Sequence, residues 1–427
     1  MYIRDIIAKK RNKMELDNEE IKFFIYNYFK GEILEEQAAA LLTLMYTNGM
    51  TVREMTYLAE GIAETGEEME LYRIASRIVD IHTIGGISDK IVVLLMCILN
   101  ALNVSTCKLT GRELGIMTKL EAVEGYKVEN NLDKLKEDIQ NYGIGIAKEP
   151  ANLAPIEDKL YKLRYNIACD NNMELIAISI MSQKLAVGCK NIVIEVTYGE
   201  NAYVKTIQDA KKLCKILTQI GQNINRNVIC FVTKLNHPLG RNSGAIIEID
   251  EIVECLNGEM ESDVKERILE FGSAILEITE IEKNPSKAKK QIMDVINSGA
   301  AYESFKKMIT EKGGKVEDIE KPHKAKNYVP IMSTMNGYIA EIDVNKIRMV
   351  CRYLNVIKRN ENDDIDKEAG VSIVKKVGDL IKPGEIIAYV HTNEDNKISR
   401  AISEVKDAFI ISDKKISKTK EIDFKIV

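Results

Sequence analysis

Apolar residues recur at helical spacing through the first 66 residues of the chain. The first helix that this spacing predicts has its apolar face at Ile21, Phe24, Ile25 and Tyr28. Asp17 and Glu20 stand at the two positions of a capping box, and Gly31 ends the segment. Two further helices are predicted over 38–48 and 51–62. Three short amphipathic helices bury little surface alone, so we expect them to pack on one another or on a partner subunit.

The pattern changes at about Ile78 to strands that alternate with helices. The runs 191–196 (NIVIEV) and 228–232 (VICFV) are β-branched and lack polar alternation, as in a parallel sheet that is covered on both faces. A helix with apolar positions from Ile207 to Leu217 separates them and completes a βαβ unit. The middle of the chain is therefore predicted to be an α/β lobe with a central, mostly parallel sheet.

The segment 313–330 is charged, contains glycine and proline, and is predicted to be a linker. A smaller α+β domain is expected beyond it, over 331–427. Within this domain Asn336-Gly337 predicts a hairpin turn, and 374–392 predicts a strand, a turn and a second strand.

Composition and charge exclude several classes of protein. The chain is 45% hydrophobic and 29% charged, as in an ordinary globular protein, and its net charge of −5 argues against nucleic acid or an anionic membrane as a partner. The longest apolar run, 91–104, is too short to cross a bilayer. The eight cysteines form no CxxC pair and the four histidines lie far apart, so we expect neither a zinc site nor a disulfide framework. A cytoplasmic location is expected.

Two loops of the predicted α/β lobe carry groups that suit an anion. The first combines a histidine, a hydroxyl and two glycines: His82, Thr83, Gly85 and Gly86. Their backbone N–H groups, at the start of a helix, can approach a phosphate. The second loop, 107–115, repeats this chemistry with Lys108 and Thr110. Each loop alone is also compatible with an ordinary tight turn.

A third stretch offers groups that could bind a small heterocycle. Arg164 precedes an apolar helix on which Ser179 and Gln183 lie one turn apart, on one face. A guanidinium, a hydroxyl and a carboxamide can together recognise the edge of a heterocyclic base. The alternative is a solvated arginine with two surface polar residues.

The order of these motifs resembles, from end to end, the pyrimidine-nucleoside phosphorylase and thymidine phosphorylase family. HTIGGISDK (82–90) stands where that family has a Lys-His-Ser-Thr-Gly-Gly loop, and KLTGRELG (108–115) where it has Lys-x-Ser-Gly-Arg-Gly-Leu-Gly. Four further segments follow in the family's order: 152–164 (NLAPIEDKLYKLR), 179–188 (SIMSQKLAVG), 236–251 (NHPLGRNSGAIIEIDE) and 376–385 (KVGDLIKPGE).

The resemblance implies a fold of three parts. A helical lobe of residues 1–66 would be completed by about 160–190, an α/β lobe would take 67–159 and 191–312, and the C-terminal α+β domain would be hammerhead-like. The resemblance also implies a homodimer formed through the N-terminal helices. The implied reaction is the reversible phosphorolysis of uridine, thymidine or deoxyuridine to free base and pentose 1-phosphate. Inorganic phosphate is the co-substrate, and no organic cofactor is implied.

The family's site residues fall on this chain as follows. Catalytic roles map to His82 and Arg164. The phosphate-binding set maps to Thr83, Gly85, Gly86, Lys108 and Thr110. The base-binding set maps to Arg164, Ser179 and Gln183.

Several positions depart from the family's pattern. Ile81 stands where the family has a phosphate-binding lysine, and Gln183 where it has a lysine that contacts the base. A Gly-Gly-Thr turn of the phosphate site is shortened to 116–119, and 195–203 lacks a lysine and a glycine. Because one well-placed electrostatic donor is typically worth about 2.7–4 kcal/mol in an active site, phosphorolysis is expected to be slow or altered.

The family's monovalent-cation site, usually for potassium, consists mainly of carbonyl groups and one carboxylate. It maps to Ser88, Lys90, Leu239, Asn242 and Glu251. Glu251 keeps the carboxylate, and Lys90 would bring an ammonium group near it.

Three functions stay open at this point. The chain could be a phosphorylase with slow or altered activity, supported by the surviving polar residues. It could instead be a catalytically silent paralogue that binds a nucleoside or a partner protein as a sensor or subunit, supported by the departures. An enzyme that uses another nucleophile or sugar-linked substrate is also compatible with them.

Overall fold

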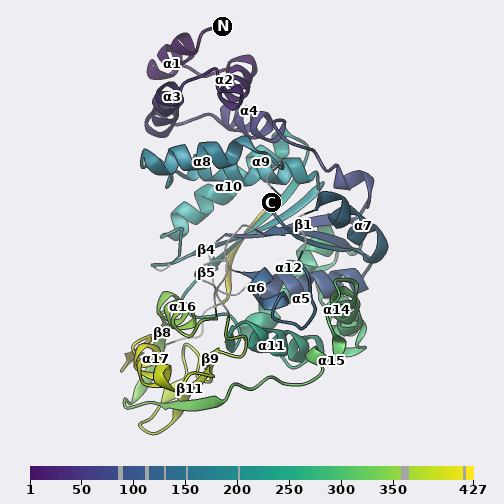
Figure 1. The fold of residues 1–427 in the computed structure, drawn as a ribbon, viewed down its shortest axis with the longest axis vertical. Coiled ribbons are helices and arrows are strands. Elements are labelled where there is room, and N and C mark those ends of the chain that lie inside the picture. The colour runs from purple at the N-terminus through teal and green to yellow at the C-terminus, as the bar shows by residue number, and fades with distance from the viewer. Residues whose placement is uncertain are drawn as a thin grey trace.

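The computed structural model describes residues 1–84, 90–110, 115–128, 131–150, 152–200, 202–356, 365–416 and 420–427. A helical lobe lies at one end of the elongated molecule, an α/β lobe in the middle and a small β-rich domain at the other end (Figure 1). The three-part fold class that the sequence predicts is thereby confirmed. No helix in the described ranges is long and apolar enough to cross a membrane.

Four N-terminal helices form the end of the helical lobe: α1 (Ile3–Arg11), α2 (Asn18–Lys30), α3 (Glu35–Asn48) and α4 (Val52–Ala63). The predicted capping box of Asp17 and Glu20 is present at α2, and Thr51 with Glu54 forms a second one at α4. α1 was not predicted, because it buries only two apolar side chains, Ile3 and Ile6. Later helices pack beneath α1–α4 and complete the lobe (Figure 1): α8 (Ile156–Asn166) and α9 (Met173–Val187).

A six-stranded sheet forms the centre of the α/β lobe, in the order β13-β5-β4-β1-β2-β3. Five strands are parallel: β1 (Ile78–Ile84), β2 (Ser105–Thr110), β3 (Ile144–Lys148), β4 (Asn191–Tyr198) and β5 (Asn227–Lys234). The predicted βαβ unit is confirmed as β4, α10 (Ile207–Asn223) and β5.

Each face of this sheet is covered by a separate apolar core. The first core contains Val79 and Ile81 and is shared with these helices: α5 (Lys90–Ala101), α6 (Ile116–Leu120), α11 (Ile246–Leu256), α12 (Ser262–Ile278), α13 (Pro285–Asn297) and α14 (Ala300–Glu311). The second core contains Ile78 and Ile84 and extends into the helical lobe, α10 and α7 (Leu132–Tyr142). We call these the α5 face and the α9 face of the sheet.

Two small sheets form the C-terminal domain. One has the order β10-β8-β12 and the other β6-β9-β11-β7. Their strands are β6 (Asn242–Gly244), β7 (Asn327–Met332), β8 (Gly337–Ile342), β9 (Gly370–Ile373), β10 (Leu380–Ile381), β11 (Ile386–Thr392) and β12 (Phe409–Ser412). The accompanying helices are α16 (Val344–Tyr353), α17 (Ile398–Lys406) and the short 3-10 helix η2 (Asp395–Lys397) that directly precedes α17. Another 3-10 helix, η1 (Leu71–Arg73), precedes β1.

Three local features differ from the sequence predictions. The Asn336-Gly337 hairpin is wrong, because β7 pairs with β11 and β8 pairs with β10 and β12, in different sheets. The segment 313–330 carries α15 (Val316–Ile319) and the first part of β7. The last strand, β13 (Ile422–Ile426), leaves the C-terminal domain and pairs antiparallel with β5, where it covers the edge of the main sheet.

Candidate active site

The carboxyl end of β1 brings the predicted site residues to the central sheet. Side chains alternate along the strand, so Asp80 and His82 lie on the α9 face, while Ile81 and Thr83 lie on the α5 face. Val79 is the register partner of Thr106 on β2, which places Lys108 and Thr110 on the same face as Ile81 and Thr83. The two faces therefore divide the candidate site into two parts.

His82 is half-buried, and its Nδ1 atom is buried without a hydrogen-bond partner among the described residues. Burial, together with the positive charges of Lys184 and Lys108, lowers the pKa of His82 well below its usual value. Lys184 Nζ lies 2.9 Å from Asp80 Oδ1 in a buried ion pair that joins α9 to β1. His82 is thus a neutral imidazole at neutral pH, because burial and two nearby positive charges disfavour its protonation.

The predicted base-binding residues meet on the helices of the α9 face. Arg164 is 5% exposed, and its Nη1 atom donates to the Leu175 carbonyl at 2.8 Å. Its Nη2 atom lies 3.4 Å from Ser179 Oγ. Gln183, one turn further along α9, is half-buried and makes no side-chain hydrogen bond with the described residues.

Glu157 is a member of this group that sequence reasoning missed. Its Oε1 atom accepts from Arg164 Nη2 at 2.7 Å and from the Ser179 hydroxyl, while Oε2 is buried without a partner among the described residues. Burial raises the pKa of Glu157, and the Arg164 charge and the hydrogen bonds oppose that shift. Its spacing of seven residues from Arg164, two turns on one helix face, was the available signal.

Two exposed tyrosines lie near the same arginine. The guanidinium of Arg164 lies 5.7 Å from the centre of the Tyr161 ring, and Tyr161 is 54% exposed. Tyr203, which follows β4, donates its hydroxyl to the Asp170 carbonyl at 2.9 Å. Aromatic rings beside a guanidinium offer a surface on which a planar base can stack.

The α5 face carries the predicted phosphate-binding side chains. Lys108 is 5% exposed and Thr110 9% exposed, at the end of β2, and Thr83 is the register partner of Glu195 on β4. The predicted residues Gly85, Gly86 and Ser88 lie outside the described residues. Thr197, where the family has a lysine, donates its hydroxyl to the Ile84 carbonyl at 2.8 Å.

Ile81 packs into the apolar core of the α5 face and is 2% exposed. It is the register partner of Val193, which belongs to the same core. The shortened turn forms α6, where Ile116 and Met117 are buried in this core and Lys119 is 4% exposed. These two departures thus add apolar side chains to the core of the α5 face, the face that also carries Lys108.

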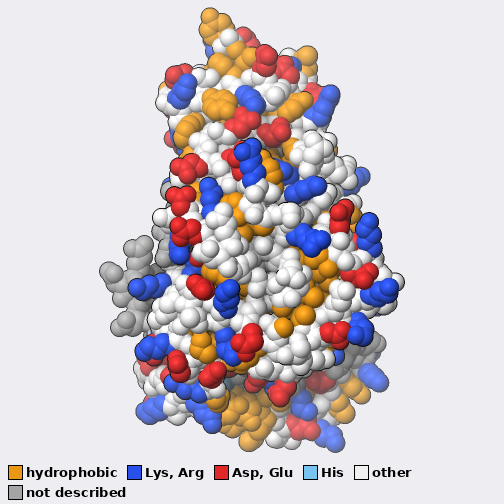
Figure 2. All heavy atoms as spheres, turned by 90° about the vertical axis from the view of Figure 1, so that its right-hand side faces the viewer, with side chains coloured by type: hydrophobic (Ala, Val, Ile, Leu, Met, Phe, Trp, Pro, Cys, Tyr) orange, Lys and Arg blue, Asp and Glu red, His pale blue; other side chains and the backbone are white. Residues whose placement is uncertain are grey.

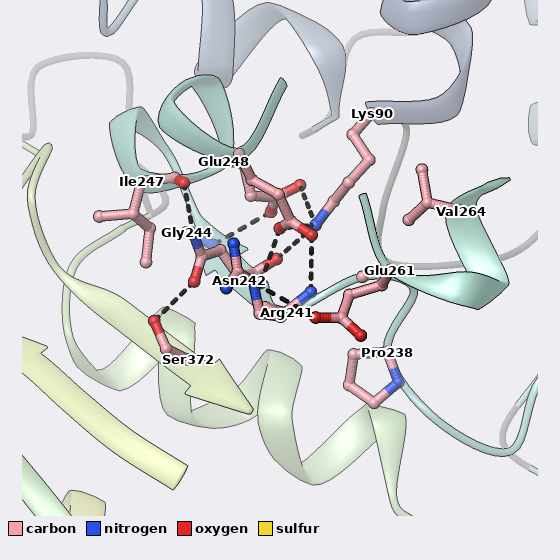
Figure 3. Close-up of polar contacts among 12 residues, drawn as sticks. Lys90, Pro238, Arg241, Asn242, Gly244, Ile247, Glu248, Glu261, Val264 and Ser372 are labelled. Atoms are coloured by element: carbon pink, nitrogen blue, oxygen red, sulfur yellow. Dashed lines mark hydrogen bonds and ion pairs between the residues drawn. The ribbon is translucent and has the colours of Figure 1, made fainter. Parts of the chain in front are cut away.

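Three of the candidate cation residues, Lys90, Asn242 and Glu251, meet in a buried ionic cluster (Figure 3). Lys90 Nζ lies 2.6 Å from Glu251 Oε2 and 2.8 Å from the Asn242 carbonyl oxygen. Glu251 also accepts the backbone N–H groups of Arg241 and Asn242, at 2.7 and 2.8 Å. Leu239 is 6% exposed and belongs to the adjoining apolar core. The described residues contain no group of three histidine, cysteine or acidic side chains that is arranged to hold a metal.

Comparison with known proteins matches all three parts of the fold. Residues 4–66 match the helical bundle domain of a glycosyl transferase family, and 75–302 match its a/b domain. Residues 338–412 match the pyrimidine nucleoside phosphorylase C-terminal domain. The crystal structure of anthranilate phosphoribosyltransferase from Thermus thermophilus covers 72% of this chain and 98% of its own, with a TM-score of 0.56 and 15% identity, which shows a shared fold.

These matches place the chain in a glycosyl transferase family that has a helical bundle domain and an α/β domain. Pyrimidine-nucleoside phosphorylases from Staphylococcus aureus strains USA300 and bovine RF122/ET3-1 are each 32% identical to the chain over 426 residues, 98% of both proteins. The chain belongs to the pyrimidine-nucleoside phosphorylase family.

Proposed function

We propose that the chain catalyses the reversible phosphorolysis of a pyrimidine nucleoside, and that it does so slowly. The observation that carries this proposal is the division of polar groups at the end of β1. Arg164 and Ser179 lie on the α9 face, Lys108 and Thr110 lie on the α5 face, and the charges of both Lys184 and Lys108 act on His82. Such an arrangement can hold a base and a phosphate on opposite sides of one sugar.

The proposed reaction forms a bond from a phosphate oxygen to C1′ and breaks the bond from C1′ to the base. The electron pair of the broken bond moves onto the pyrimidine, so N–H donors near its carbonyl oxygens stabilise the departing anion. Arg164 is the charged donor in this position, and the amide of Gln183 lies one turn beyond Ser179. Lys108 and the hydroxyls of Thr83 and Thr110 would hold the phosphate.

Two features support a slow rate. Ile81 offers no charge to a phosphate dianion and lies in the same apolar core as Val193. One carboxylate oxygen of Glu157 accepts hydrogen bonds from both Arg164 and Ser179. A pyrimidine base must therefore compete with that carboxylate for the same donors. Losses within one site are not additive, but each lowers transition-state stabilisation.

The test is a phosphate-dependence assay. Purified protein is incubated with uridine, thymidine and deoxyuridine, with and without inorganic phosphate, and release of free base is followed by chromatography. Base release that requires phosphate, falls at least about tenfold in Lys108→Ala, and is unchanged in Lys190→Ala is the expected result. Lys190 is an exposed lysine directly before the amino end of β4, whereas the candidate site lies at the carboxyl ends of the parallel strands.

A second candidate is a silent paralogue that binds a nucleoside without cleaving it. The closed Glu157, Arg164 and Ser179 group favours it, because both terminal guanidinium nitrogens of Arg164 and the Ser179 hydroxyl already have hydrogen-bond partners. The same experiment separates the two. No base release with any substrate, together with a uridine-dependent rise in melting temperature that Arg164→Ala removes, would establish the binding protein.

We further propose that the chain forms a homodimer through its N-terminal helices, in the cytoplasm. Hydrophobic side chains lie among charged ones at the N-terminal end of the molecule (Figure 2), and Leu34 and Phe29 are 62% and 44% exposed there. All eight cysteines are buried and free, which suits a reducing compartment. Sedimentation velocity should give a dimer that Leu34→Asp dissociates and that Met335→Asp, at an exposed site of the C-terminal domain, does not.

A further inference from the structure

Lys90 is fully buried at the start of α5, and its ammonium group lies between β6 and α11. Figure 3 shows the side chain reaching across to Asn242 and the acidic residues of α11. A lysine side chain is almost never fully buried unless it is paired. The Lys90 ammonium group must therefore have compensating partners in the protein interior.

The oxygen atoms around Lys90 Nζ form a cation site. The Glu251 carboxylate lies at 2.6 Å, the Asn242 carbonyl at 2.8 Å and Glu248 Oε2 at 3.8 Å. Glu251 is itself fixed by two backbone N–H groups, and Glu248 Oε1 accepts the N–H of Gly244 at 3.0 Å. Carbonyl and carboxylate oxygens in a fixed array are the ligands of a hard monovalent cation, and the ammonium group takes that place here.

Charge and space both exclude a second cation. Lys119 Nζ lies 3.6 Å from Glu248, so two lysines face the two buried carboxylates of α11. A further positive charge would have no uncompensated partner in this buried group, which carries a large desolvation cost. Space is also short, since a Cβ atom at Gly240 would overlap Glu251 Oε1 and would lie 3.0 Å from Lys90 Nζ.

We propose that the ammonium group of Lys90 is the resident monovalent cation of this chain, and that potassium is not bound at this site. The residues to which the family's potassium site maps do not fit the ion, because Lys90 occupies the Asn242 carbonyl and the Glu251 carboxylate. The Lys90 side chain thus connects the start of α5 to β6 and α11 through its own covalently attached charge, so that no dissociable ion is needed there. Lys90 is thus a positioning residue, and its role does not depend on which substrate the chain uses.

The first measurement uses the native chain, freed of potassium by dialysis. Its melting temperature is recorded in potassium, sodium and tetramethylammonium chloride at matched ionic strength. The proposal expects the same melting temperature in all three salts. A saturable rise with potassium alone would overturn it, since a free site would then exist.

The second measurement uses Lys90→Ser, which removes the ammonium group and leaves the oxygen atoms in place. This variant should melt several degrees lower in tetramethylammonium chloride, and potassium should restore most of the loss in a saturable manner, because potassium and an ammonium group are similar in size. A matched control is Lys184→Ser, which removes another buried lysine, paired with Asp80 at 2.9 Å. It should lose stability equally in every salt.

Either of two results with Lys90→Ser counts against the proposal. Equal melting temperatures in all three salts would mean that the oxygen atoms do not form a cation site. Failure to fold in any salt would mean that a free ion cannot replace the tethered one. Because the readout is unfolding and not base release, neither result depends on the proposed phosphorolysis.

Discussion

At the scale of one residue, a substitution at Ile81 can show whether a missing positive charge is the only defect of the proposed phosphate site on the α5 face. Its side chain is 2% exposed on the α5 face, the face that also carries Lys108. Ile81→Lys should lower the free energy of unfolding by at least about 2 kcal/mol, because it buries a second ammonium group beside Lys108. Inorganic phosphate should then raise the melting temperature of this variant more than that of the native chain.

The control for this substitution is Ile81→Met, which has a similar length and no charge. It should cost less than about 1.5 kcal/mol and should not respond to phosphate. If phosphate stabilises Ile81→Lys no more than Ile81→Met, missing charge is not the only defect, and the shortened turn at 116–119 has also removed part of the anion site.

Glu157 gives a second prediction at this scale. Glu157→Gln leaves Arg164, which is 5% exposed, without its counter-charge, and breaking a buried pair in this way typically costs about 3–5 kcal/mol. Urea denaturation should show this loss. Asp158→Asn, at the exposed neighbouring position, should change stability by less than about 0.5 kcal/mol. Equal effects of the two substitutions would contradict the buried pair.

Candidate site residues could be predicted from the sequence where they belong to a motif, but not where their role depends on contacts between elements. Arg164 and Ser179, which the structure brings within 3.4 Å of each other, could be singled out because each belongs to a motif with a characteristic order along the chain. Glu157 was missed because its role depends on a contact across helices, from α8 to Ser179 on α9. The environment of Ile81 also needed the structure, since only the register of β1 and β4 shows that it faces the core.

At the scale of elements, a chain of hydrogen bonds joins the C-terminal domain to β6. Ser372 on β9 donates its hydroxyl to Asn242 Oδ1 at 2.6 Å, and His391 on β11 lies 2.7 Å from the same hydroxyl oxygen. Because a hydroxyl has one hydrogen, His391 Nε2 must be the donor to Ser372. Asn242 then donates to the Ile247 carbonyl at 2.8 Å (Figure 3).

Because His391 is a member of this series of hydrogen bonds, the free energy of unfolding should depend on pH. Burial lowers the pKa of His391 from its usual 6.5 to about 4, so the unfolded state binds a proton that the folded state does not. Stability from this group is therefore present above about pH 6.5 and is lost as the pH falls towards 4, by up to about 1.4 kcal/mol per pH unit. His391→Gln should flatten the dependence of unfolding free energy on pH over this range.

The effect of pH on stability has the opposite sign at His323. Its hydrogen bond to Asp250 raises its pKa above 6.5, so its contribution is present below pH 6.5 and is lost as the pH rises through the folded value. His323→Gln should therefore destabilise the protein most at acidic pH. If the two substitutions change the pH profile in the same direction, the assignment for His391 is wrong.

Elements with a strong local signal were predictable, and those set by distant pairing were not. The capping box of α2 and the β-branched strands β4 and β5 follow from short stretches of sequence, and the structure confirms them. The Asn336-Gly337 turn has an equally strong local signal, but β7 and β8 find partners in different sheets. Tertiary pairing overrides the turn there, and no local pattern reports it.

At the scale of the whole molecule, the chain ends by returning to its centre. After the C-terminal domain, β13 pairs with β5 and closes one edge of the main sheet, beside α10 and α12 (Figure 1). Glu421 Oε2 lies 3.1 Å from Arg267 Nη2, and Arg267 also pairs with Glu195 of β4 at 2.5 Å. Lys211 of α10 lies 3.2 Å from the centre of the Phe424 ring. The last seven residues thus tie three elements of the α/β lobe together.

Deletion of residues 421–427 should therefore destabilise the whole molecule. It removes one partner of the buried Arg267 and exposes the edge of β5, so we expect a loss of about 2–4 kcal/mol and association through the free edge. Thermal unfolding with light scattering measures both effects. Glu421→Gln, which weakens the ion pair but keeps the strand, should lower the melting temperature without causing association. A deletion variant that stays monodisperse and melts like Glu421→Gln would mean that β13 contributes only this ion pair, and that the edge of β5 does not need a cover.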